Sequence, residues 1–188
     1  MTVIISIDPS TTVTGWAVFS HEPLEYEDGL GQASPAPIYH IPPDQSWLLV
    51  ETGIIIAHNR PKRVEVSERI QAIKDELTRM VDKWQPVEVA CGKPAALQLP
   101  YQQQGIEMLG ITIENWAAEL DLSYHIYQLR EVREAILGRA TAAKEELAYA
   151  VMNRWGLLGI GKSSHEWCAI AVGDYHLARR RSESVLSA

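Results

Sequence analysis

A run of apolar, mostly β-branched residues opens the chain and constrains its fold more than any other feature. Residues 2 to 7 read Thr-Val-Ile-Ile-Ser-Ile, which is typical of a buried strand. The run stops at Asp8 and Pro9, because proline cannot continue a hydrogen-bonded ladder. A second apolar run, residues 15 to 19, follows so closely that it predicts an antiparallel partner. We therefore expect a sheet whose first strand ends in a carboxylate.

Strands and helices alternate along the rest of the chain. Further strands are predicted at residues 48 to 57, 87 to 91 and 124 to 128. Apolar residues three and four apart predict a helix over residues 66 to 84 and another around Ile106 to Leu120. The closing helices are predicted at residues 132 to 137, at 142 to 155 with Thr141 as cap, and at 165 to 180.

This order of elements predicts an α/β protein with a ribonuclease H-like fold. Three antiparallel strands lead into two parallel crossovers, which gives a mixed five-stranded sheet flanked by helices. The length of 188 residues suits one domain, residues 1 to 188. A long loop at about residues 21 to 46 holds five prolines, and such loops are often functional.

Composition narrows the class of protein without deciding its partners. Two cysteines cannot form a disulfide framework, and the apolar runs are too short to cross a membrane, so we expect a soluble intracellular protein. A net charge of −7 argues mildly against nucleic acid. Basic residues are nevertheless clustered, at Arg130, Arg133, Arg139 and Lys144 and at residues 179 to 181. A local basic surface is compatible with a negative total.

Four residues are candidates for chemistry. The Asp8 carboxylate, at the carboxyl end of a strand, can hold a divalent cation against a phosphate oxygen, although Asp-Pro-Ser also caps turns readily. Gly92 ends the fourth strand and is expected at the same crevice. His165 and Cys168 are three apart and share a helix face, so they can point at one site. The alternatives are an exposed first-turn histidine and a small buried hydrophobic residue.

Together these segments resemble the RuvC family of Holliday junction resolvases, particularly its short phage-type members. The resemblance runs from end to end of the chain, in order and spacing. It rests on four stretches: residues 7 to 16 (IDPSTTVTGW), 89 to 94 (VACGKP), 132 to 144 and 165 to 171 (HEWCAIA). It implies recognition of four-way DNA junctions by a cytoplasmic protein of a bacterial or phage-infected cell.

The resemblance also implies a catalytic site. In the family, a cluster of acidic residues binds Mg²⁺ and a water molecule attacks the phosphodiester. The first-strand aspartate corresponds to Asp8 and the fourth-strand glutamate falls on Gly92. The last-helix pair falls on His165, where the family uses Asp or His, and on Cys168, where it uses Asp. Two of the four expected ligands are therefore kept.

The two departures predict impaired cleavage. Glycine has no ligand atom, and a thiolate is a soft ligand that suits Mg²⁺ or Mn²⁺ poorly. Glu166 is the first alternative carboxylate, but its position next to His165 on a helix turns it about 100° away. Besides an impaired nuclease, we consider a junction-binding protein that does not cut. A weaker alternative is an actin-like ATPase fragment, since residues 8 to 15 are similar to that family's phosphate loop.

The resemblance further implies partners and the surfaces that bind them. Basic residues would contact DNA phosphates, although charged helix positions are usually solvated: Lys93, Arg130, Arg133, Arg139 and Lys144. A homodimer is expected through an apolar seam that could equally serve the core: Ile106, Leu109, Ile113 and Trp116. We expect neither a membrane partner nor a small-molecule cofactor beyond the metal.

Overall fold

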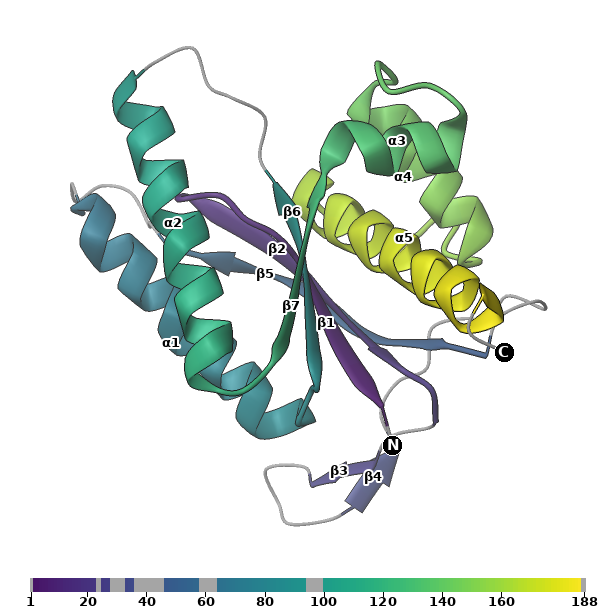
Figure 1. Cartoon of the computed structure of the whole chain (residues 1–188), viewed down its shortest axis with the longest axis horizontal. Coiled ribbons are helices and arrows are strands. Elements are labelled where there is room, and N and C mark those ends of the chain that lie inside the picture. Colours follow the sequence, from purple (N-terminus) through teal and green to yellow (C-terminus); the bar gives the residue numbers. More distant parts are fainter. Residues whose placement is uncertain are drawn as a thin grey trace.

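The computed structural model describes residues 2–22, 25–27, 33–35, 46–57, 64–93 and 100–186. Helices cover both faces of a central twisted sheet (Figure 1). Within these ranges, no helix has the length and apolar character needed to span a membrane.

The sheet has five strands in the order β5-β2-β1-β6-β7. The first strand lies at its centre, pairing antiparallel with β2 and parallel with β6, while β2–β5 is antiparallel and β6–β7 is parallel. The predicted mixed sheet is therefore confirmed. Its strands are β1 (Val3–Asp8), β2 (Val13–Ser20), β5 (Leu48–Ile56), β6 (Glu88–Lys93) and β7 (Ser123–Gln128).

Two helices pack on one face of the sheet and three on the other (Figure 1). Each face has its own apolar core, because alternate residues of the strands point to opposite sides. The first pair is α1 (Val66–Trp84) and α2 (Pro100–Glu119). The second group is α3 (Leu129–Leu137), α4 (Lys144–Arg154) and α5 (Ser164–Leu186).

The long helix α5 packs on the second face of the sheet. It lies against β2, β1 and β6, and the Ser6 hydroxyl in the middle of β1 donates to the Ala169 carbonyl at 2.7 Å. Because strand residues alternate, Asp8 and Glu88 lie on this face with Ser6, at opposite ends of neighbouring strands. One helix therefore lies beside both ends of the sheet.

Some element boundaries differ from the predictions. Helix α4 begins at Lys144 after Ala143, whose backbone N–H donates to the Glu146 carboxylate at 2.8 Å, so the predicted Thr141 cap is wrong. Part of the predicted 21–46 loop forms an antiparallel pair of short strands, β3 (Glu25–Glu27) and β4 (Ala33–Pro35). The rest of that loop lies largely outside the described residues.

The apolar seam of α2 belongs to the core of the chain itself. Leu109, Ile113 and Trp116 are at most 1% exposed, and the Trp116 indole N–H donates to the Thr78 hydroxyl of α1 at 3.1 Å. These side chains offer no surface to a partner, so their assignment to a dimer interface is wrong. Ile106, at the edge of the seam, is half-buried.

Candidate functional site

The carboxyl end of β1 holds a carboxylate–imidazole pair. Asp8 ends the strand with its side chain 7% exposed, and its Oδ2 lies 2.7 Å from Nδ1 of His165, in the first turn of α5. The imidazole is 27% exposed, so the pair opens to solvent through the histidine. The structure thus brings together Asp8 and His165, the two expected ligands that this chain keeps.

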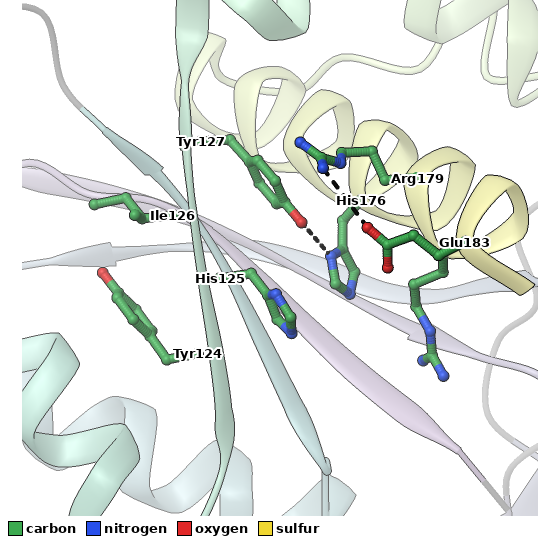
Figure 2. Close-up of a pocket in the computed structure, with 8 residues that line it drawn as sticks. Tyr124, His125, Ile126, Tyr127, His176, Arg179 and Glu183 are labelled. Atoms are coloured by element: carbon green, nitrogen blue, oxygen red, sulfur yellow. Dashed lines mark hydrogen bonds and ion pairs between the residues drawn. The ribbon is translucent and has the colours of Figure 1, made fainter. Parts of the chain in front are cut away.

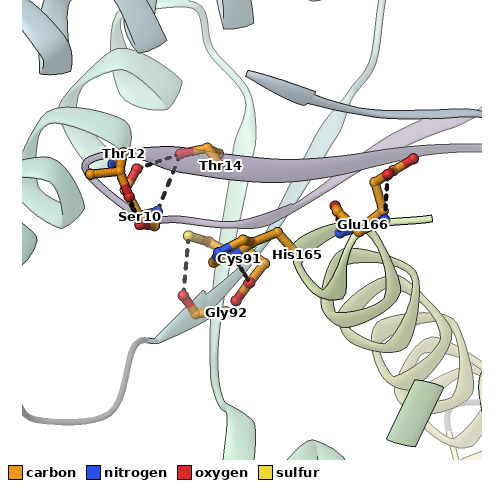
Figure 3. A network of polar contacts seen from close by, with 9 residues as sticks. Ser10, Thr12, Thr14, Cys91, Gly92, His165 and Glu166 are labelled. Carbon is orange, nitrogen blue, oxygen red and sulfur yellow. Dashed lines mark hydrogen bonds and ion pairs between the residues drawn. The ribbon is translucent and has the colours of Figure 1, made fainter. Parts of the chain in front are cut away.

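A close backbone approach sets the position of His165. A Cβ atom at Gly15 would lie 2.1 Å from the His165 carbonyl oxygen, so β2 can meet the start of α5 only where it has glycine. The turn before Gly15 is held locally, because the Thr14 hydroxyl donates to the Ser10 carbonyl at 2.8 Å. Figure 3 shows this turn beside His165.

The other two family positions also face this end of the sheet, without ligand atoms that Mg²⁺ can use. A Cβ at Gly92 would contact Val172 of α5, the Ile7 carbonyl and Leu129 at 3.2 to 3.4 Å. Cys168 is 1% exposed, and burial raises the pKa of its thiol to about 12, with a smaller contribution from the Asp8 charge. At neutral pH Cys168 is therefore a protonated thiol, not a thiolate.

Glu166 does not substitute for a missing ligand. One of its carboxylate oxygens accepts the Ser163 backbone N–H at 2.9 Å, and the other accepts the Thr52 hydroxyl at 3.1 Å. The Ser163 hydroxyl accepts the Glu166 backbone N–H in return, which completes a capping box at the start of α5. Glu166 stands apart from Cys91 and Gly92 in Figure 3, and its proposed role as a substitute ligand is wrong.

The predicted basic residues are not equivalent in the structure. Positive charges at Lys144 and Arg133 lower the pKa of Cys168, against the larger effect of burial, so both residues act electrostatically on the site. The Arg133 Nε atom is buried without a hydrogen-bond partner among the described residues.

The other three predicted basic residues lie at the surface. Arg139 forms an ion pair with Glu146, which partly neutralises the positive charge that it could offer to DNA phosphates. Arg130 and Lys93 are exposed, and Lys93 ends β6 next to Gly92.

The site can orient an imidazole, but it fits magnesium poorly. When His165 Nδ1–H donates to Asp8, the ring's Nε2 can accept a proton, as in other carboxylate–histidine pairs. Mg²⁺ requires several oxygen ligands in near-octahedral geometry. Within the described ranges, Asp8 and His165 are not joined by a third His, Cys, Asp or Glu close enough to share an ion. We therefore expect the site to hold Mg²⁺ only weakly.

A second polar cluster on the same face was not predicted from the sequence. At the other end of β6, Glu88 accepts from His176 of α5 and pairs with Arg180, and His176 is hydrogen-bonded to Tyr127 of β7. Two spacings in the sequence indicate part of this cluster: His176 and Arg180 are four apart on a helix, and His125 and Tyr127 are two apart on a strand, so each pair shares a face. The position of Glu88 beside them follows only from the order of the strands in the sheet.

Known proteins with this architecture include bacterial RuvC. The crossover junction endodeoxyribonuclease RuvC of Francisella tularensis subsp. novicida is 25% identical over 187 residues, covering 94% of this chain and 90% of the relative. A structure of Thermus thermophilus RuvC matches with a TM-score of 0.70 and 21% identity over 97% of both chains. T. thermophilus RuvC in complex with Holliday junction substrate matches with a TM-score of 0.64 and 20% identity, over 92% of this chain and 90% of that one.

These matches confirm the ribonuclease H-like fold and the predicted similarity to RuvC. No protein-family model matches the chain. The phage-type subclass stays a prediction.

Proposed function

We propose that this chain is a RuvC-like resolvase that recognises four-way DNA junctions and cleaves them with impaired efficiency. The observation that carries the proposal is the Asp8–His165 pair at 2.7 Å, built at the carboxyl end of the central strand. Relatives that span nearly the whole chain are named crossover junction endodeoxyribonucleases. An actin-like ATPase fragment has no comparable support.

DNA contact is proposed for the basic residues around that pair. Arg133 and Lys144 act electrostatically on the site, and Lys93 lies beside Gly92 at the end of β6. Phosphate contacts of this kind position DNA and depend steeply on salt, without reading sequence. A local surface of this sort can bind DNA although the whole chain carries a charge of −7.

Impairment follows from the ligands that the site offers. Divalent-metal chemistry on a phosphodiester needs several anionic oxygens to offset the charge of the ions. Here Asp8 is the carboxylate at the site, Gly92 contributes no side chain, and Cys168 is a neutral thiol. Mg²⁺ or Mn²⁺ would be held weakly, so we propose that junction binding persists while cleavage is slow.

A homodimer is part of the proposal, through a different surface from the predicted seam. The outer side of α2 exposes Ile111 by 59% and Met108 by 43%, three residues apart on one helix face. A two-fold contact there would present two sites to two strands of a junction. Sedimentation should give a dimer at micromolar concentration, and Ile111→Glu should give a monomer.

One experiment tests binding and cleavage together. A labelled four-way junction and a linear duplex of equal length are incubated with the protein in EDTA, Mg²⁺ or Mn²⁺, and followed by mobility shift and denaturing gel. We expect preference for the junction in all three conditions, with slow nicking in the two metals. Equal affinity for both DNAs would contradict junction recognition. Binding with no nicks at all would identify a junction-binding protein that has lost catalysis.

A further inference from the structure

Three side chains from three elements bring potential metal ligands together at the end of the sheet opposite Asp8. The Glu88 Oε2 atom of β6 lies 2.9 Å from Nε2 of His176 on α5 and 3.6 Å from Nε2 of His125 on β7. Ligand atoms of all three residues lie within 4.8 Å of one another. Figure 2 shows His125 and His176 entering the same space from the strand and the helix.

We propose that Glu88, His125 and His176 form a binding site for Zn²⁺. Zinc in proteins is tetrahedral, with bonds of about 2.0 to 2.1 Å to imidazole nitrogen and to carboxylate oxygen. Ligand atoms around such an ion are separated by about 3.3 Å, from the tetrahedral angle and these bond lengths. The two separations of 2.9 and 3.6 Å lie on either side of this value, so small side-chain movements would suffice.

The neighbours of these side chains are those that a zinc site needs. Tyr127 places its hydroxyl 2.7 Å from Nδ1 of His176, so an Nδ1–H that donates to it leaves Nε2 available for the metal. Arg180 binds the other oxygen of Glu88 at 2.7 Å and fixes the orientation of the carboxylate. His176 is 1% exposed, which restricts its ring further.

Metal ligands must be deprotonated. Without metal, the Nε2–H of His176 donates to Glu88, so zinc binding requires the tautomer that carries its proton on Nδ1 and donates it to the Tyr127 hydroxyl.

Three protein ligands leave one coordination position for water. The cluster borders a cavity of about 330 Å³ that Arg179, Arg180 and Glu183 also line. Such a cavity supplies water to the metal, and the Glu183 carboxylate offsets part of the positive charge that Arg179 and Arg180 contribute. Two histidines, one carboxylate and one water form a ligand set that zinc uses in proteins.

This site is separate in space and in chemistry from the proposed nuclease site. His165 and His176 are eleven residues apart on α5, which corresponds to about 16 Å along a helix. Imidazole nitrogen suits zinc and related transition metals, whereas magnesium prefers oxygen. Zinc at Glu88 would join α5 to β6 and β7, because its ligands come from all three elements.

The test uses the full chain and two matched histidine variants. Metal is removed with a chelator, and the protein is titrated with Co²⁺, whose tetrahedral complexes absorb visible light, and then with Zn²⁺. We expect one equivalent of cobalt to give a visible band that zinc abolishes. His125→Gln removes a ligand that is 42% exposed and should eliminate the band without unfolding the chain. His165→Gln changes the histidine at the other end of α5 and should retain it.

Thermal unfolding provides a second readout. Free Zn²⁺ at roughly 100 times its dissociation constant should raise the Tm of the wild type by about 5 to 10 °C, and that of His125→Gln by much less. Absence of the cobalt band, or a band lost in His165→Gln but kept in His125→Gln, would overturn the proposal. The cluster would then be a hydrogen-bonded network that holds α5 on the sheet. Junction binding is measured separately, so either result leaves the proposed function to its own test.

Discussion

The two ends of α5 meet the same sheet face with very different supporting contacts. At the first turn, His165 meets Asp8 next to a glycine and a protonated thiol. About three turns later, His176 meets Glu88, with Tyr127 on its other ring nitrogen and Arg180 on the other carboxylate oxygen. The first end keeps part of a known motif but lacks ligands. The second end matches no part of that motif and has more ligands.

This difference shows that a motif and a metal site are separate properties of a fold. Ligand number, atom type and neighbouring hydrogen bonds decide where an ion binds. By those criteria the described residues favour a transition metal at Glu88 over magnesium at Asp8.

The largest effect is expected from restoring oxygen ligands at the Asp8 end. Gly92→Glu combined with Cys168→Asp should raise Mg²⁺-dependent junction cleavage by about 100-fold or more, while each single change does much less, since ligands of one site act as a unit. A Cβ at position 92 is accommodated if Val172 moves slightly, because its tightest contact is 3.2 Å. Cleavage is measured on a labelled junction under single-turnover conditions.

Two controls define that result. Adding Asp8→Asn to the double variant should abolish cleavage again, and the cobalt band at Glu88 should be unchanged throughout. Rapid cutting by the unaltered chain would contradict the account of impairment.

The next effect concerns the stability that Glu88 provides in the absence of metal. Glu88→Ala leaves His176 and Arg180 without their shared carboxylate at a position where the Glu88 side chain is 14% exposed. Breaking such a network should lower the free energy of unfolding by about 2 to 4 kcal/mol in EDTA at pH 7. The measurement is urea unfolding followed by circular dichroism.

The control is Glu76→Ala, which removes an exposed surface pair with Arg79. It should cost at most about 1 kcal/mol. Equal losses for the two variants would mean that the Glu88 network contributes no more than a surface ion pair.

A third, smaller effect tests how the Asp8 end is positioned. Gly15→Ala places a methyl group 2.1 Å from the His165 carbonyl, so β2 and the start of α5 must separate. We expect a loss of about 1 to 3 kcal/mol in unfolding free energy and slower junction cleavage, because His165 moves away from Asp8. Unfolding and cleavage are measured on the same preparation.

Gly110→Ala is the matched control for that change. Position 110 lies within α2, and apart from the adjacent residues and the nearby backbone of that helix no described atom lies within 4 Å of the added methyl group. Alanine there should stabilise the chain by about 0.5 to 1 kcal/mol, because it favours the helix. If Gly15→Ala is tolerated as well, the approach of β2 to α5 does not determine the position of His165.

The sequence predicted the sheet and one end of its functional face, for identifiable reasons. Strands and helices with strong periodicity, such as α1, follow from local pattern, and Asp8 and His165 follow from a motif. The Thr141 cap was wrong because Glu146 reaches back to the Ala143 backbone instead. The α2 seam was assigned to a partner because periodicity identifies an apolar face but not what covers it. The cluster around Glu88 was not predicted, because His125 and His176 lie 37 and 88 residues later in the chain.

The smallest effect is a pH dependence at the Glu88 end. Because the pKa of His125 is lowered in the folded chain, the unfolded chain binds more protons near pH 6.5, and stability falls as pH decreases. His125 contributes its full stability above pH 6.5 and loses it as pH falls through the lowered pKa. Glu88, whose pKa is also lowered, loses its contribution at still lower pH, below about 4.5. His125→Gln should therefore flatten the decline in unfolding free energy between pH 7.5 and about pH 5, and leave the decline below pH 4.5 in place. Urea unfolding in EDTA across this range checks it, and parallel profiles for wild type and variant would contradict a lowered pKa at His125.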